Sequence, residues 1–208
     1  MSAENWGALT LVLLGFGVLS GVAAWPTSGR RTWAPVTLLL LAAAAVVAAA
    51  PDQVEIDGRW VTTVLVGLGG ALAIAGGGPL TALVFDLVDR REPTTQPPAQ
   101  PPAQPPTQPP APPTTHPPAP SLEQAGRVLR GGAWIGALER VAIFATLVAG
   151  WPEGLAVVLA LKGLGRYPEL RAAEVGVRTG AAERFIIGTF TSVLWACACA
   201  GVVALLLR

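Results

Sequence analysis

The stretch FIIGTFTSVLWACACAGVVALLL, residues 185–207, decides how the rest of the chain is interpreted. It is an uncharged run of 23 residues, and crossing the hydrocarbon core of a bilayer takes about 20 residues at the helical rise. Lipid offers no hydrogen-bond partner to the backbone, so a single apolar run of this length must be helical. The stretch therefore predicts a transmembrane helix.

The composition of the whole chain agrees with a lipid environment. Of its 208 residues, 52% are hydrophobic and 13% are charged, with a mean hydropathy of +0.54, whereas soluble domains carry about 25% charged residues. The net charge is only +1, and no basic cluster of the kind that binds nucleic acid occurs. We expect an all-α integral membrane protein whose main partner is the lipid bilayer, with no nucleic-acid partner.

Three further apolar segments occupy the first part of the chain, at residues 6–25, 35–50 and 61–88. Tryptophans lie near their ends, where the membrane interface favours these rings; they are Trp6, Trp25, Trp33 and Trp60. The first run follows Glu4 without a preceding Lys or Arg and is longer than the core of a signal peptide. It predicts a retained first helix, and the three runs together predict a membrane module at residues 1–92.

The basic residues between these segments predict the orientation. Arg30 and Arg31 lie in the first loop, and Arg90 and Arg91 follow the third segment. Short loops rich in Lys and Arg stay in the cytoplasm. We therefore expect a multi-pass protein of the cell membrane with its N-terminus outside.

Residues 93–120 form a tract in which proline recurs every few residues. Such a segment favours extended polyproline II and acts as a semi-rigid spacer. Its PxxP spacing also leaves open a partner that recognises proline. We interpret the tract as a cytoplasmic linker to a second membrane module at residues 121–208; His116, inside it, is neither a ligand nor a catalyst.

The second module contains two short apolar runs, residues 141–151 and 154–161, separated by the turn WPEG at residues 151–154. Neither run alone is long enough to cross. Either both runs extend through their flanking charges and cross, or they form a re-entrant hairpin that dips into the bilayer and returns. With the final helix, the chain then has about five transmembrane helices, one of them part of this short hairpin.

Charged residues at the open end of the hairpin are the main candidates for a site. Glu139 and Lys162 lie at similar distances from the turn, so their depths differ by about 3 Å and they could pair. Arg140 could bond a carbonyl or a headgroup. The alternatives are interfacial anchoring by snorkelling side chains and a role in transport.

Alternating charges follow in RYPELRAAEVGVRTGAAER, residues 166–184, which predicts a solvated connection at the interface. The full candidate polar cluster comprises Glu139, Arg140, Lys162, Arg166, Glu183 and Arg184.

Small residues predict close helix approaches. Gly17 with Gly21, and Gly132 with Gly136, fit GxxxG, which favours association with another helix of this chain, a second copy or another membrane protein. The three glycines at residues 76–78 are expected to interrupt the third helix. Cys197 and Cys199 are two apart in a predicted helix and so point in different directions, which disfavours a mutual disulfide.

Three motifs, GAWIGALER (132–140), ALKGLGRYPEL (160–170) and AERFIIGTFTS (182–192), resemble the membrane region of an uncharacterised family of small bacterial multi-pass membrane proteins, a domain of unknown function. The resemblance covers residues 132–200 and departs from the family pattern at Leu161 and Arg184. It implies that Glu139, Arg140, Lys162, Arg166, Glu183, Gly188 and Thr189 belong to one shared constellation. It implies no reaction.

The functional expectation follows from what the sequence contains. It has no HExxH, CxxC, P-loop, GxSxG or complete GxGxxG pattern, so we expect no catalytic residues, metal or cofactor. The chain is interpreted as a non-enzymatic scaffold or accessory subunit. The alternative is a small transporter or channel element that uses the charges of the hairpin, residues 134–166.

Overall fold

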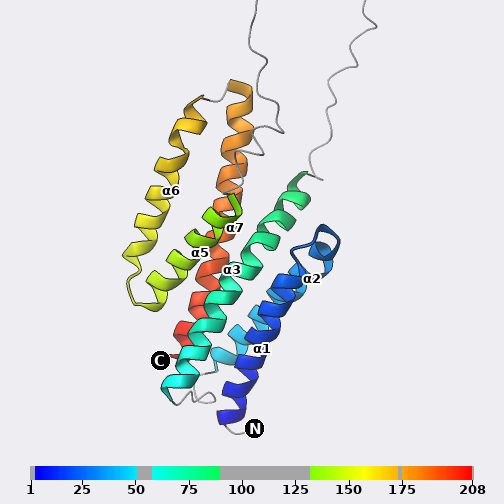
Figure 1. Cartoon of the computed structure of the whole chain (residues 1–208), viewed down its shortest axis with the longest axis vertical. Coiled ribbons are helices and arrows are strands. Elements are labelled where there is room, and N and C mark those ends of the chain that lie inside the picture. Colours follow the sequence, from blue (N-terminus) through cyan, green and yellow to red (C-terminus); the bar gives the residue numbers. More distant parts are fainter. Residues whose placement is uncertain (1–2, 51–57, 90–131, 173–174, 208) are drawn as a thin grey trace, which may run out of the picture.

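A computed structural model of the protein describes residues 3–50, 58–89, 132–172 and 175–207. These residues form an all-helical bundle (Figure 1). The helices are α1 (Ala3–Ala23), α2 (Thr27–Ala48), α3 (Arg59–Asp89), α5 (Gly132–Val148), α6 (Glu153–Ala172) and α7 (Val175–Leu206). The proline tract at residues 93–120 lies outside the described residues.

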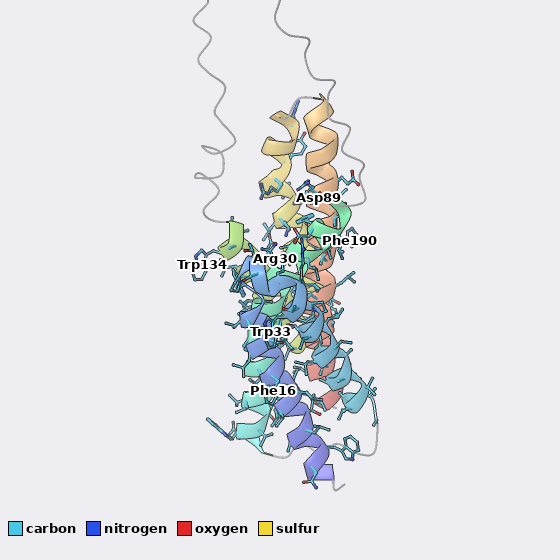
Figure 2. The ribbon with its side chains drawn as sticks, turned by 90° about the vertical axis from the view of Figure 1, so that its right-hand side faces the viewer. Phe16, Arg30, Trp33, Asp89, Trp134 and Phe190 are labelled. Atoms are coloured by element: carbon cyan, nitrogen blue, oxygen red, sulfur yellow. The ribbon has the colours of Figure 1, made fainter. Side chains whose placement is uncertain are left out.

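Four of the described helices are long and apolar enough to cross a membrane. They are α1, α2, α3 and the part of α7 from Ala182 to Leu206. Large apolar side chains point outward from these helices, among them Phe16, Trp33 and Phe190 (Figure 2). A bundle with an apolar exterior fits an integral membrane protein.

The central element is α3, which lies between α1 and α2 on one side and α5 and α7 on the other (Figure 1). One buried cluster joins both halves of the sequence, with Leu14, Leu72, Phe144, Trp195 and Val203 among its members. The helices on the two sides of the proline tract therefore share one core.

Both chain ends lie at the same end of the bundle, near the start of α3 (Figure 1). The antiparallel pair α5 and α6 has its open end at the opposite end of the bundle. Its turn lies short of the level at which α3 begins and α7 ends. The hairpin thus covers only part of the length of the bundle.

Close approaches of α1 and α3 occur where the sequence has small residues. A Cβ atom placed on Gly21 would lie 3.1 Å from the backbone nitrogen of Gly76, and one on Gly17 would lie 3.3 Å from Leu72. The Gly17 and Gly21 pair is therefore used for packing inside the chain.

The helices are longer than the sequence patterns predict. Instead of being interrupted at residues 76–78, α3 continues through them and through Pro79. The second helix starts at Thr27, well before the apolar run at 35, and includes Pro35. Most of residues 166–184 are helical, within α6 and α7. Helix–helix packing overrides weak local propensity, because the backbone gains its hydrogen bonds only by remaining helical.

Candidate functional site

The turn between α5 and α6 sets the register of the hairpin. Gly150 has a φ of 73°, a conformation that glycine adopts without strain. Its N–H donates to the Leu147 carbonyl at 3.1 Å, and the Trp151 N–H donates to the Thr146 carbonyl at 2.8 Å. These two bonds form a Schellman motif that ends α5.

Tight packing then holds the two arms together. A Cβ atom on Gly154 would lie 2.5 Å from Thr146 Cγ2, so only glycine fits this position without a shift of its neighbours. The arms therefore leave the turn in contact.

Glu139 and Lys162 form an ion pair between the two arms. Their side chains are only 14% and 18% exposed, respectively. The pair that the spacing from the turn predicts is thus present in the structure. It compensates both charges inside a largely apolar hairpin.

Arg140 is the most deeply placed charge of the hairpin, at 4% exposure. Nη2 donates to the carbonyl of Ile74 in α3, and Nη1 donates to Ser192 Oγ in α7, both at 3.4 Å. The described residues include no carboxylate within ion-pair distance of Arg140, and its Nε is buried without a hydrogen-bond partner among them. Arg140 thus links three helices through long, weak bonds.

The glycines of α3 make room for this side chain. A Cβ atom on Gly77 would lie 2.4 Å from Arg140 Cδ, and one on Gly76 would lie 2.4 Å from Cζ2 of Trp195. These residues therefore allow the guanidinium and the indole to reach the backbone of α3. Backbone exposed in this way offers its carbonyls to side-chain donors.

Three side-chain donors use carbonyls within one turn of α3. Trp195 Nε1 donates to Leu72 at 3.2 Å, Arg140 donates to Ile74, and Trp25 Nε1 donates to Ala75 at 3.1 Å. Pro79 has no N–H, so the Ala75 carbonyl lacks its usual helical partner. The Trp25 indole replaces that missing bond.

A pocket of about 880 Å³ opens between α3, α5, α6 and α7. We call it the hairpin pocket. Its charged lining consists of Arg30, Glu139, Arg140, Lys162, Arg166 and Arg184. Its uncharged polar lining includes Thr81, Thr189 and Ser192, and its apolar lining includes Trp25, Phe85, Ile135, Leu138, Leu161 and Phe185.

Two acidic residues of α3 pair with cations of the lining. Asp86 lies 3.6 Å from Arg30 Nη1, and Asp89 lies 2.6 Å from Arg184 Nη2. The Arg184 guanidinium also lies 5.8 Å from the centroid of the Phe85 ring, within the range of a cation–π contact. In Figure 2, Arg30 and Trp134 lie at a similar height along the bundle, below Asp89.

The structure brings most of the candidate cluster together. Glu139, Arg140, Lys162, Arg166 and Arg184 all line the hairpin pocket. Glu183 is exposed and is not part of the lining. The two cysteines are free, with Cys199 in the buried core away from this lining.

The sequence patterns did not identify Arg30, Ser192 or the acidic residues of α3 as neighbours of the cluster. Arg30 served only as an orientation signal. The three glycines at 76–78, next to Pro79, were the one local signal of these contacts, because small residues let side chains of other helices approach the helix backbone.

Comparisons of the chain with protein-family models, with curated proteins and with solved structures give no match. The resemblance to an uncharacterised bacterial membrane family stays a prediction.

Proposed function

We propose that the protein is a non-enzymatic integral membrane protein, a scaffold or accessory subunit, that holds a ligand in the hairpin pocket. The observation that carries the proposal is the placement of five cationic side chains around one cavity in an otherwise apolar bundle. The most buried of them, Arg140, is 4% exposed and has no ion-pair partner among the described residues. Charged residues inside a membrane protein usually have a partner, so a ligand in the cavity would explain this placement.

We further propose a cell-membrane topology with four spans and a re-entrant α5–α6 hairpin. The position of both chain ends at one end of the bundle supports an even number of crossings (Figure 1). The N-terminus would be outside, the proline tract would be a cytoplasmic linker, and the hairpin would enter from the cytoplasmic side. The short reach of its turn favours a re-entrant hairpin over two crossings.

Photo-crosslinking inside the pocket tests the binding role. Leu161 lines the pocket, whereas Leu164, on the same helix and similarly exposed, does not. A benzophenone amino acid at position 161 of the full-length protein should form an adduct of defined mass in membranes, and the same group at 164 should not form it. Equal adducts at both positions, or none at 161, would remove support for a bound ligand.

A transporter or channel element is the second candidate. It is favoured by the Glu139–Lys162 pair, because both side chains line the pocket and an ion pair can open and re-form as a substrate passes. Purified protein in liposomes should then show ion or solute flux that Glu139→Gln abolishes without loss of insertion. Unchanged flux in this variant, or no flux from the wild type, rules the role out.

Association with a second copy or another membrane protein stays a prediction. The outer faces carry apolar side chains such as Phe16 and Phe190, which either lipid or another helix can cover.

A further inference from the structure

We propose that the hairpin pocket binds an anionic phosphate group, supplied either by a lipid headgroup or by phosphate in solution. The inference rests on the proposed binding function, because it names the ligand class of the same pocket. Three observations carry it: the sign of the charged lining, the polar atoms without partners around it, and the weak bonding of Arg140.

Cations outnumber carboxylates in the charged lining, and three of the five cations pair with an acidic residue. Five cationic side chains and one carboxylate line the pocket. Glu139 pairs with Lys162, while Asp86 and Asp89 pair with two further cations from outside the lining. No acidic residue in the described part of the chain forms an ion pair with Arg140. A negative ligand would supply the missing charge.

Buried polar atoms without hydrogen-bond partners belong to residues that line the same pocket. Across the described residues, the buried side-chain atoms without a hydrogen bond are Arg30 Nε, Arg140 Nε and Thr189 Oγ1, and all three residues line the pocket. Thr191, two residues further along α7, donates to the carbonyl one turn before it. Thr189 Oγ1 makes no such hydrogen bond, although Thr189 lies in the same helix. Buried polar groups normally have partners, so a cluster of exceptions points to a ligand that supplies them.

Arg140 has unused donor capacity. A guanidinium carries five N–H donors, and the two bonds of Arg140 are both 3.4 Å long. Phosphate oxygens accept short, charge-assisted and often bidentate bonds from arginine. A phosphate group beside Arg140 would therefore be favoured over the hydroxyl and carbonyl that it now contacts.

The apolar wall favours a phosphate carried by a lipid. Ile135, Leu138 and Leu161 line the pocket and are 56%, 66% and 65% exposed. Acyl chains could lie along these side chains while the headgroup enters between the cations. The volume of about 880 Å³ lies within the usual range of about 300–1,000 Å³ for ligand pockets.

Lipid retention by the full-length protein tests the proposal. The protein would be placed in nanodiscs containing equal amounts of phosphatidylglycerol, which is anionic, and phosphatidylcholine, whose choline neutralises the phosphate. Native mass spectrometry then counts the lipids that each variant retains. Parallel samples in phosphatidylcholine alone receive radiolabelled inorganic phosphate, so that binding from solution is measured separately.

Two matched pairs of variants locate the binding. Arg30→Gln alters the lining, whereas Arg31→Gln changes an adjacent exposed cation outside it. Gly165→Leu fills the pocket and Gly163→Leu does not, although a Cβ atom at either glycine meets nothing within 4 Å. All four variants keep Arg140. Arg30→Gln also removes the ion pair with Asp86, so the Gly165→Leu and Gly163→Leu pair tests the pocket without changing any charge.

The wild type should retain phosphatidylglycerol over phosphatidylcholine, and Arg30→Gln and Gly165→Leu should weaken that retention by roughly tenfold, the effect of one charge-assisted hydrogen bond. The two controls should behave as wild type. Binding of inorganic phosphate that is lost in the same two variants would support the proposal with solution as the source. Equal retention of both lipids without phosphate binding, or equal losses in variants and controls, would overturn it. If a crosslinked adduct still forms at position 161, only the ligand class fails and the binding function stands.

Discussion

Glu139 of α5 and Lys162 of α6 form an ion pair at corresponding positions on the two arms of the hairpin. The next residue, Arg140, turns away from that pair and reaches the backbone of α3. Two adjacent charges thus have different partners. Glu139 joins the two arms of the hairpin, and Arg140 extends from the hairpin to α3.

The first prediction concerns the coupling of Glu139 and Lys162. Glu139→Gln or Lys162→Met alone leaves a largely buried charge without its partner, whereas the double variant removes both charges. A double-mutant cycle on the free energy of unfolding in detergent should give a coupling of about 1–3 kcal/mol, above the usual 0.2–1 kcal/mol of exposed pairs. A coupling near zero would mean that the two charges act as independent interfacial anchors.

The second prediction concerns the glycine beside Arg140. Gly77→Ala places a methyl group 2.4 Å from Arg140 Cδ, the middle of a buried side chain that cannot move aside freely. We expect the protein to lose about 1–3 kcal/mol of stability, the typical cost of overpacking. Thermal unfolding in detergent, followed by circular dichroism, measures the effect.

Gly67→Ala, on an exposed part of the same helix, is the control, because a Cβ atom there meets nothing within 4 Å. Its stability should equal or slightly exceed that of the wild type. Similar losses in both variants would show that α3 needs glycine for its own conformation rather than to admit Arg140.

The third prediction separates binding from packing at Arg140. Arg140→Met keeps much of the volume and removes a buried charge that lacks an ion-pair partner in the described part of the chain. Replacing buried charges by apolar residues is often neutral or stabilising. We therefore expect a free energy of unfolding within about 1 kcal/mol of the wild-type value. We also expect the variant to lose ligand retention in nanodiscs.

Phe144→Ala, one turn further along α5, should behave in the opposite way. Phe144 belongs to the buried core, and its truncation should cost about 3–5 kcal/mol. If Arg140→Met destabilises the protein as strongly while ligand retention is unaffected, Arg140 serves packing alone.

The fourth prediction concerns the depth of the hairpin turn. In a background without Cys197 and Cys199, Trp151→Cys should react with a lipophilic maleimide and resist an impermeant maleimide applied from either side. Asn5→Cys, at the exposed start of α1, should react with the impermeant reagent from outside. Labelling of position 151 from outside would indicate that both arms cross the membrane.

The sequence predicts the local features of this structure better than its long-range contacts. The apolar run at 185–207 predicts a transmembrane helix and the end of α7, although α7 begins earlier, at Val175. The turn at 151–154 predicts the break between α5 and α6. The same turn predicts which charges of the hairpin meet. These features depend on residues close together in the chain.

The partners of Arg140 depend on residues far apart in the chain. Ile74 contributes a carbonyl, which every residue has, so its identity carries no signal. Ser192 is one of several hydroxyl residues in α7. The glycines at 76–78 were interpreted as a helix break because glycine favours coil in water, whereas in α3 they admit Arg140 and Trp195. Tertiary packing decides which carbonyl and which hydroxyl Arg140 contacts, and patterns in a single sequence do not reveal that packing.

The central claim is that α5 packs against α3, because the hairpin pocket exists only if the two halves of the chain meet. A Cβ atom on Gly70 would lie 3.4 Å from Phe144 Cε1, so Gly70→Cys and Phe144→Cys would lie within reach of a short bifunctional thiol crosslinker, in a background without Cys197 and Cys199. A protease site within residues 93–120 would allow the two halves to be separated after crosslinking in native membranes. We predict that the fragments stay joined on a non-reducing gel, and that they separate when Gly67→Cys, on the exposed side of α3, replaces Gly70→Cys. Separation of the fragments in both cases would contradict the account.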